Sequence, residues 1–130
     1  MEMLTKQDIT EPLLLIRIPK LFKPGMTEEA LYEATRGVWK VNPDRAKNAQ
    51  YALCIAKNSV QEVYVIEQPW NPADPSNYKT RNDLTTIKYA GRWEFIGKVA
   101  PVEIRSKYVG KSTTNMFKKG EANPISYVNI

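Results

Sequence analysis

The sequence predicts a single α+β domain whose small mixed, mostly antiparallel sheet curls into a partial or complete barrel and carries two short helices. Its 130 residues, 42% of them hydrophobic, are enough for one core without disulfides or a structural metal. The apolar segments are short and do not alternate regularly with helices, which argues against a parallel α/β fold. The longest apolar run, Leu13 to Ile16, is too short to cross a bilayer. We therefore expect one domain over residues 1–130, with 1–11 as a loose N-terminal segment.

The first part of the chain contains a strand and a helix. Residues 12–19 are apolar on both faces and bounded by prolines, as in an interior strand. Thr27 is a good N-cap, and the following helix should end at Arg36, before Gly37. Asn42 then begins a turn or a short helix. Elements of this length suit a compact domain.

The middle of the chain predicts a β-hairpin followed by a long loop. Residues 51–56 and 60–67 are the two arms, and Lys57 and Asn58 form the turn. The segment from Trp70 to Ala90 begins among prolines and reads as a loop of about twenty residues. Loops of this length in a compact domain are usually functional or mobile.

The last third returns to short elements. A strand is expected over residues 92–99, and a helix over residues 102–108, with Pro101 at its start. Residues 115–119 form one further helical turn in this interpretation. Residues 125–130 close the chain as a strand.

Positive charge is concentrated in one part of the sequence. The chain has a net charge of +5, but residues 1–78 hold nine basic and ten acidic residues, whereas residues 79–119 hold ten basic and three acidic ones. Such asymmetry favours capture of polyanions. A solvated, solubilising surface explains the same charge.

The chain lacks the residues that several classes of catalytic site require. The chain has no histidine and one cysteine, so it contains no Ser-His or Cys-His pair and no workable set of zinc ligands. Cys54 lies in an apolar run and is expected to be a buried, inert thiol, which together with the missing disulfide suits the cytoplasm. No cofactor is expected. A metal-dependent nuclease using Glu94, Lys98 and Glu103 is retained only as a minor alternative.

Basic and aromatic residues lie together in three short motifs. Arginine and lysine can bind phosphate, and an indole face can stack on a base. Of the tryptophans, Trp39 is interpreted as a pocket wall, Trp93 as a core residue, and Trp70 as a packed loop residue or a lid. We expect one concave, positive surface lined by Arg36, Trp39, Arg92, Lys107 and Lys111, with Tyr108 or Trp93 nearby. Lys40 is also assigned to ligand binding.

The predicted function is non-catalytic binding of an anionic nucleotide or a nucleic acid. Sequestering or sensing a signalling nucleotide, for example in phage defence, is one form of that function. The alternative is a protein-interaction module that presents the hairpin and an exposed Trp70 loop to a partner. Pairing of edge strands would allow a two-fold homodimer, although nothing in the sequence requires one. No association with a membrane is expected.

Four motifs resemble a family of small bacterial and phage proteins. They are LYEATRGVWK (31–40), GRWEFIG (91–97), KYVGKS (107–112) and NPISYVN (123–129). The resemblance covers nearly the whole chain from Leu13 onward and implies no particular activity. The order of strands and helices is also similar to that of PUA-type domains, a group that includes readers of modified bases. That similarity is an analogy of fold alone.

Overall fold

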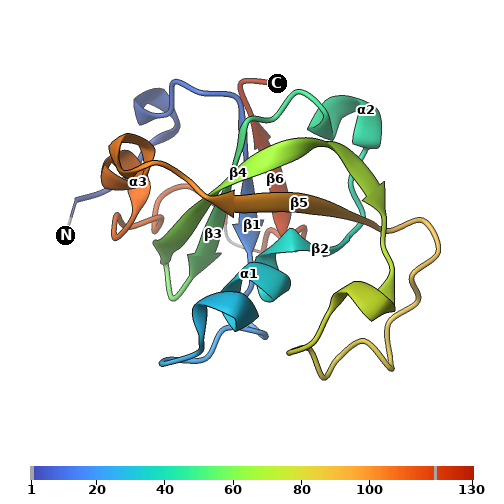
Figure 1. The fold of residues 1–130 in the computed structure, drawn as a ribbon. Coiled ribbons are helices and arrows are strands. Elements are labelled where there is room, and N and C mark those ends of the chain that lie inside the picture. The colour runs from blue at the N-terminus through green and yellow to red at the C-terminus, as the bar shows by residue number, and fades with distance from the viewer. Residues whose placement is uncertain (1, 119) are drawn as a thin grey trace.

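The computed structural model describes residues 2–118 and 120–130 as an α+β fold built on one curled sheet (Figure 1). The strands are β1 (Leu13–Arg17), β2 (Gly37–Trp39), β3 (Tyr51–Ala56), β4 (Ser59–Pro72), β5 (Trp93–Val99) and β6 (Ile125–Val128). The helices are α1 (Glu28–Arg36), α2 (Pro43–Ala46) and α3 (Val102–Tyr108), with 3-10 turns η1 (Lys6–Asp8) and η2 (Pro75–Asn77). None of the described helices has the length and apolar character needed to cross a membrane.

The six strands form a half-barrel in the order β2-β5-β4-β3-β1-β6. Among the strands of the described residues, β1 and β3 pair in parallel and the other four pairs are antiparallel. The predicted fold class, a mixed and mostly antiparallel curled sheet, is therefore confirmed. β1 lies between two neighbours, as its run of apolar residues predicts, because a central strand is buried on both faces.

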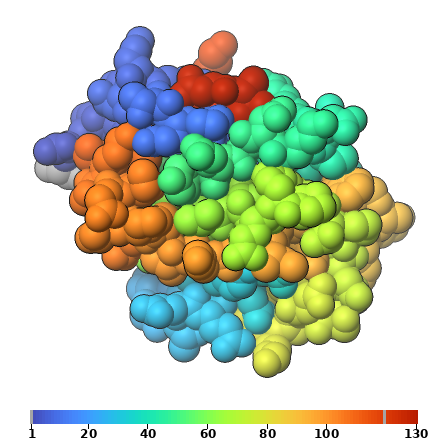
Figure 2. All heavy atoms as spheres, turned by 45° about the horizontal axis from the view of Figure 1, so that its top comes forward, coloured from blue at the N-terminus to red at the C-terminus, as the bar shows by residue number. Residues whose placement is uncertain are grey.

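The sheet separates two hydrophobic clusters. Alternate residues of a strand point to opposite faces, so Leu14 and Ile16 of β1 join one cluster, and Leu13 and Leu15 join the other. Residues of α1 and α2 belong to the first cluster, whereas α3 and the N-terminal segment belong to the second. In Figure 2 the C-terminal residues lie between the N-terminal segment and α2. The sheet thereby separates residues that were predicted to form one binding surface.

Local signals correctly placed both ends of α1. The Thr27 side chain accepts a hydrogen bond from the Ala30 amide at 3.0 Å, as an N-cap does. Gly37 follows the helix and at once begins β2, a three-residue strand that the sequence did not predict. The Asn42 side chain caps α2 in the same way by accepting from the Asp44 and Arg45 amides.

Two predicted segments differ in the structure. Strand β4 continues through Pro69 to Pro72, so Trp70 lies in a strand rather than in a loop. Its side chain is 4% exposed, and its ring meets that of Phe95 at 5.2 Å between centroids. A register shift between Glu67 and Asn71 lets the strand pass the prolines. The loop therefore begins after Pro72.

The N-terminal segment is packed rather than loose. Leu4 and Ile9 are buried, and the Leu4 amide donates to the Ser112 carbonyl at 2.8 Å. The predicted helical turn over 115–119 is instead a turn over 114–116, and Lys119 lies outside the described residues. Cys54 is fully buried, and burial raises its pKa to about 12. The prediction of a buried thiol is confirmed, and its inertness stays a prediction.

Candidate functional site

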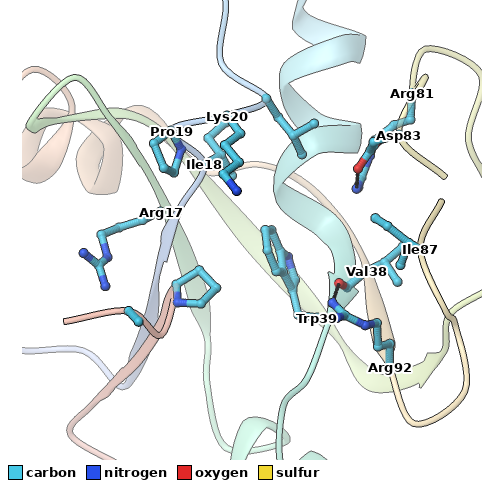
Figure 3. A pocket seen from close by; sticks show the side chains of 13 residues that line it. Arg17, Ile18, Pro19, Lys20, Val38, Trp39, Arg81, Asp83, Ile87 and Arg92 are labelled. Atoms are coloured by element: carbon cyan, nitrogen blue, oxygen red, sulfur yellow. Dashed lines mark hydrogen bonds and ion pairs between the residues drawn. The ribbon is translucent and has the colours of Figure 1, made fainter. Parts of the chain in front are cut away.

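An open cavity of about 460 Å³ lies beside the end of β1 (Figure 3). It lies between the loop that follows β1, strand β2, the loop that precedes β5 and the segment that precedes β6. The lining side chains are Arg17, Ile18, Pro19, Lys20, Leu21, Val38, Trp39, Arg81, Asp83, Ile87, Arg92, Ala122 and Pro124. Small-molecule sites commonly have volumes of about 300–1,000 Å³.

Trp39 lies at the centre of the lining residues in Figure 3. β2 holds its backbone against β5, where it pairs with Trp93. Its indole Nε1 donates to the Thr35 carbonyl at 2.8 Å, so the edge of the ring is fixed to the end of α1. The half-buried ring is thereby held in one orientation along the cavity. Trp39 therefore lines the cavity, and its role in binding a ligand stays a prediction.

Two cations that line the cavity make few hydrogen bonds or ion pairs with the described residues. Arg92 makes one hydrogen bond, from Nη1 to the Val38 carbonyl at 3.1 Å, out of the five N–H donors of a guanidinium. Lys20 is exposed and has no ion-pair partner among the described residues. In Figure 3 its ammonium points toward the Trp39 ring. Charge and an aromatic face therefore meet in this cavity.

The other cations of the cavity are more fully engaged. Arg17 donates to the carbonyls of Glu121 and Asn123 at 3.1 and 2.6 Å, and its side chain turns away from Trp39 in Figure 3. Arg81 is nearly buried and binds both carboxylate oxygens of Asp83, at 2.9 and 2.8 Å. The only carboxylate among the lining residues is therefore already neutralised. Cations still outnumber carboxylates among the lining residues, although Arg17 also pairs with the Glu121 carboxylate at 4.0 Å.

Arg81 also fastens the loop to helix α1. Its Nη1 donates to the Glu33 carbonyl at 3.1 Å and to the Gly37 carbonyl. The Glu33 side chain accepts from the Lys79 and Thr80 amides and from the Thr80 hydroxyl, each at 2.8 Å. Burial alone would raise the pKa of Glu33, but these hydrogen bonds outweigh it and hold the pKa below its ordinary value. The loop and α1 lie side by side in Figures 1 and 2.

Arg36 does not line the cavity, which corrects the prediction that it joins Trp39 there. Its side chain is 8% exposed and forms an ion pair with Glu94 at 3.3 Å. It also donates to the carbonyls of Phe95 and Asn77, at 2.9 and 3.2 Å. Trp39 and Arg36 occupy different environments because the chain leaves α1 at Gly37 and becomes extended. Arg36 therefore holds α1, β5 and η2 together and is not available for a ligand.

Lys107, Tyr108 and Lys111 lie on the opposite side of the sheet from Trp39, so the predicted single surface is not formed. Lys107 pairs with Glu11 at 2.5 Å, and Tyr108 is buried and donates to the same carboxylate. Burial and this hydrogen bond raise the pKa of Tyr108. Lys111 pairs with Glu2 at 3.5 Å. Acidic residues of the N-terminal segment, distant in sequence, neutralise this basic motif.

The remaining predicted residues take ordinary positions. Lys40 is exposed and does not line the cavity. Trp93 is partly buried and packs against the first hydrophobic cluster, as its interpretation as a core residue predicts. The structure thus brings together Trp39 and Arg92 from the predicted set, and adds Lys20 and Arg17. The sequence offered one clue to Arg17 and Lys20. Arg17 is the last residue of the buried strand, and Lys20 follows it closely.

One residue named in each of the two alternative functions is buried, and both functions stay untested. Glu94, the main carboxylate of the nuclease hypothesis, is 1% exposed and is bound by Arg36, Asn77 and the Asp74 amide. No group of three potential metal ligands occurs within residues 2–118 and 120–130. Trp70, expected on a partner surface, is in the core.

Comparisons with protein-family models, with curated proteins and with solved structures gave no match. The resemblance to small bacterial and phage proteins therefore stays a prediction.

Proposed function

We propose that the Trp39 cavity binds an anionic nucleotide, alone or as part of a nucleic acid, without catalysing a reaction. The base would stack on the Trp39 ring, and the phosphate would lie against Arg92 and Lys20. The observation that carries the proposal is the meeting of a fixed indole with two incompletely paired cations in a cavity of about 460 Å³.

The chemistry of the cavity suits both halves of a nucleotide. Stacking of a base on an aromatic side chain contributes about 1–3 kcal/mol, and a hydrogen bond to a charged group about 1.5–3 kcal/mol. Ile87, Leu21 and Pro124 add apolar surface that a base can bury and that a bare phosphate cannot use. A nucleotide should therefore bind more tightly than inorganic phosphate or an uncharged nucleoside.

Calorimetric titration of the protein with nucleoside monophosphates, nucleosides and inorganic phosphate tests the proposal. Trp39→Leu removes the stacking face and Lys20→Ala removes one cation, so each should weaken nucleotide binding by roughly tenfold, equivalent to about 1.4 kcal/mol. Lys47→Ala is the matched control, because Lys47 is exposed and lies outside the cavity. Urea unfolding confirms that each variant is folded.

Two results would overturn this function. One is the absence of any nucleotide binding by the folded parent protein. The other is nucleotide binding that neither Trp39→Leu nor Lys20→Ala weakens relative to the Lys47→Ala control.

A further inference from the structure

The Trp39 cavity is one part of a longer series of hollows. A second hollow, of about 250 Å³, shares Arg17 and Pro19 with it and continues over the β3–β4 turn at Lys57 and Asn58. A third, of about 400 Å³, shares Phe117 with the second and reaches η1. We group these neighbouring hollows, which share lining residues, under the name long groove.

The long groove continues on the other side of the Trp39 cavity as well. A fourth hollow, of about 240 Å³, shares Lys20, Leu21, Arg81 and Asp83 with the cavity and extends along α1. The loop that follows β1 therefore lies in the middle of the groove. A ligand filling only the Trp39 cavity would leave both extensions empty.

Each part of the long groove supplies positive charge. Beyond the cavity, Lys57 lines the second hollow, Lys6 and Lys118 line the third, and Lys23 lines the fourth. Asp83 is the only acidic residue among the lining residues of all four, and it is bound by Arg81. A track of cations with so little negative charge matches a ligand whose negative charge repeats along its length.

A second flat platform lies along the same groove. The Arg17 guanidinium stacks over the Phe117 ring at 4.2 Å from its centroid, and the Arg17 side chain is 22% exposed. Bases of single-stranded nucleic acids stack on aromatic rings and on guanidinium planes. The Trp39 ring and the Arg17–Phe117 pair thus provide two stacking positions, in adjoining hollows.

We propose that the long groove binds single-stranded nucleic acid, with one base on Trp39 and another on the Arg17–Phe117 pair. This inference rests on the proposed function, and it specifies the ligand as a strand of several nucleotides rather than a free nucleotide. Stacked bases and a backbone track are the two components of sequence-tolerant binding to single strands. Double-stranded nucleic acid would not suit this groove, because its bases are already stacked on one another.

The test is a length series of thymidine oligonucleotides, from the monophosphate to about ten nucleotides, titrated by calorimetry at about 50 and about 200 mM salt. Affinity should rise with length to about four nucleotides or more before reaching a plateau. The double variant Lys57→Asn, Lys118→Ala removes two cations that lie outside the Trp39 cavity. Asparagine is chosen because position 57 has a φ of 53°, which asparagine tolerates.

The double variant should weaken binding of the long oligonucleotide only. Each phosphate contact contributes about 0.7 to the slope of log affinity against log salt for single strands, so the slope should fall by about 1.4. Binding of the monophosphate should stay unchanged. The control pair Lys47→Ala, Lys98→Ala, in which both lysines are exposed and lie outside all four hollows, should bind every length as the parent does.

Three results would overturn the proposed binding of single strands in the long groove. They are an affinity that does not depend on oligonucleotide length, a double variant that lowers monophosphate and oligonucleotide binding equally, and competition by polyglutamate or duplex DNA as strong as that by a single-stranded oligonucleotide. Length-independent binding that still needs Trp39 leaves the nucleotide pocket intact and removes only the groove. Length-dependent binding that is insensitive to Trp39→Leu would contradict both the nucleotide pocket and the base position on Trp39, and would leave only the track of cations.

Discussion

Replacement of Glu94 by glutamine should destabilise the protein strongly, because it leaves the Arg36 guanidinium buried without its counter-charge. The two side chains are 2% and 8% exposed, and their charged atoms are 3.3 Å apart. Removing one partner of such a pair costs about 3–5 kcal/mol. Domains of this kind are stable by about 5–15 kcal/mol in total, so the variant should lose a large share of its stability.

Urea unfolding followed by tryptophan fluorescence and circular dichroism measures this loss. With a urea dependence of about 2 kcal/mol per molar, the midpoint should fall by about 1.5–2.5 M. Glu103→Gln is the control, because Glu103 is exposed on α3 and should change stability by less than about 0.5 kcal/mol. A double-mutant cycle with Arg36→Met should show that the second substitution costs much less once the first is present.

The cycle also separates a structural role of Arg36 from a role in binding. Folded Arg36→Met protein should retain nucleotide affinity, because Arg36 does not line the cavity. The reasoning fails if Glu94→Gln costs no more than Glu103→Gln. It fails equally if Arg36→Met keeps its stability but loses the nucleotide.

Three further predictions follow from packing and titration. Gly37→Ala should lose about 1–3 kcal/mol in thermal unfolding, because a Cβ there would overlap the Tyr78 hydroxyl and lie 2.8 Å from the Glu94 Cβ, and adding Tyr78→Phe should recover only part of the loss. Cys54, whose pKa burial raises to about 12, should react with a thiol reagent at neutral pH only as fast as the protein unfolds; rapid labelling without denaturant would contradict this. The pKa of Glu33 lies below its ordinary value of 4.5 in the folded protein. The free energy of folding that the ionised Glu33 side chain contributes is therefore fully present above pH 4.5, and it is lost as the pH falls through the lowered pKa. The protection factor of the Thr80 amide, which is the exchange rate corrected for its intrinsic pH dependence, should fall in that acid range, and Glu33→Gln should abolish this fall.

The elements with strong local signals were predictable from sequence. Thr27 and Gly37 bracket α1, and Pro101 precedes α3, because capping and proline chemistry act within one helical turn. Strand β2 has only three residues and depends on pairing with β5, a contact distant in sequence. Trp70 was assigned to a loop because the prolines around it ordinarily end strands, whereas the irregular register of β4 accommodates them.

The candidate site was predictable only in part. Trp39 and Arg92 do meet, because β2 pairs beside the start of β5. Lys107 and Lys111 form an equally basic motif in the sequence, but Glu11 and Glu2 neutralise them through contacts that no local pattern reveals. Arg36 is prominent for its charge and its tryptophan neighbour. Its burial against Glu94 depends on how α1 packs on β5.

The loop that forms one wall of the Trp39 cavity is fastened near both ends before any ligand arrives. Glu33 holds the Lys79 and Thr80 amides, and Arg92 holds the Val38 carbonyl. A ligand entering this cavity would not have to freeze a disordered segment, so little conformational entropy would be spent on association. Encounter rates should consequently be set by diffusion and charge attraction, and differences in affinity among related ligands should appear in their residence times.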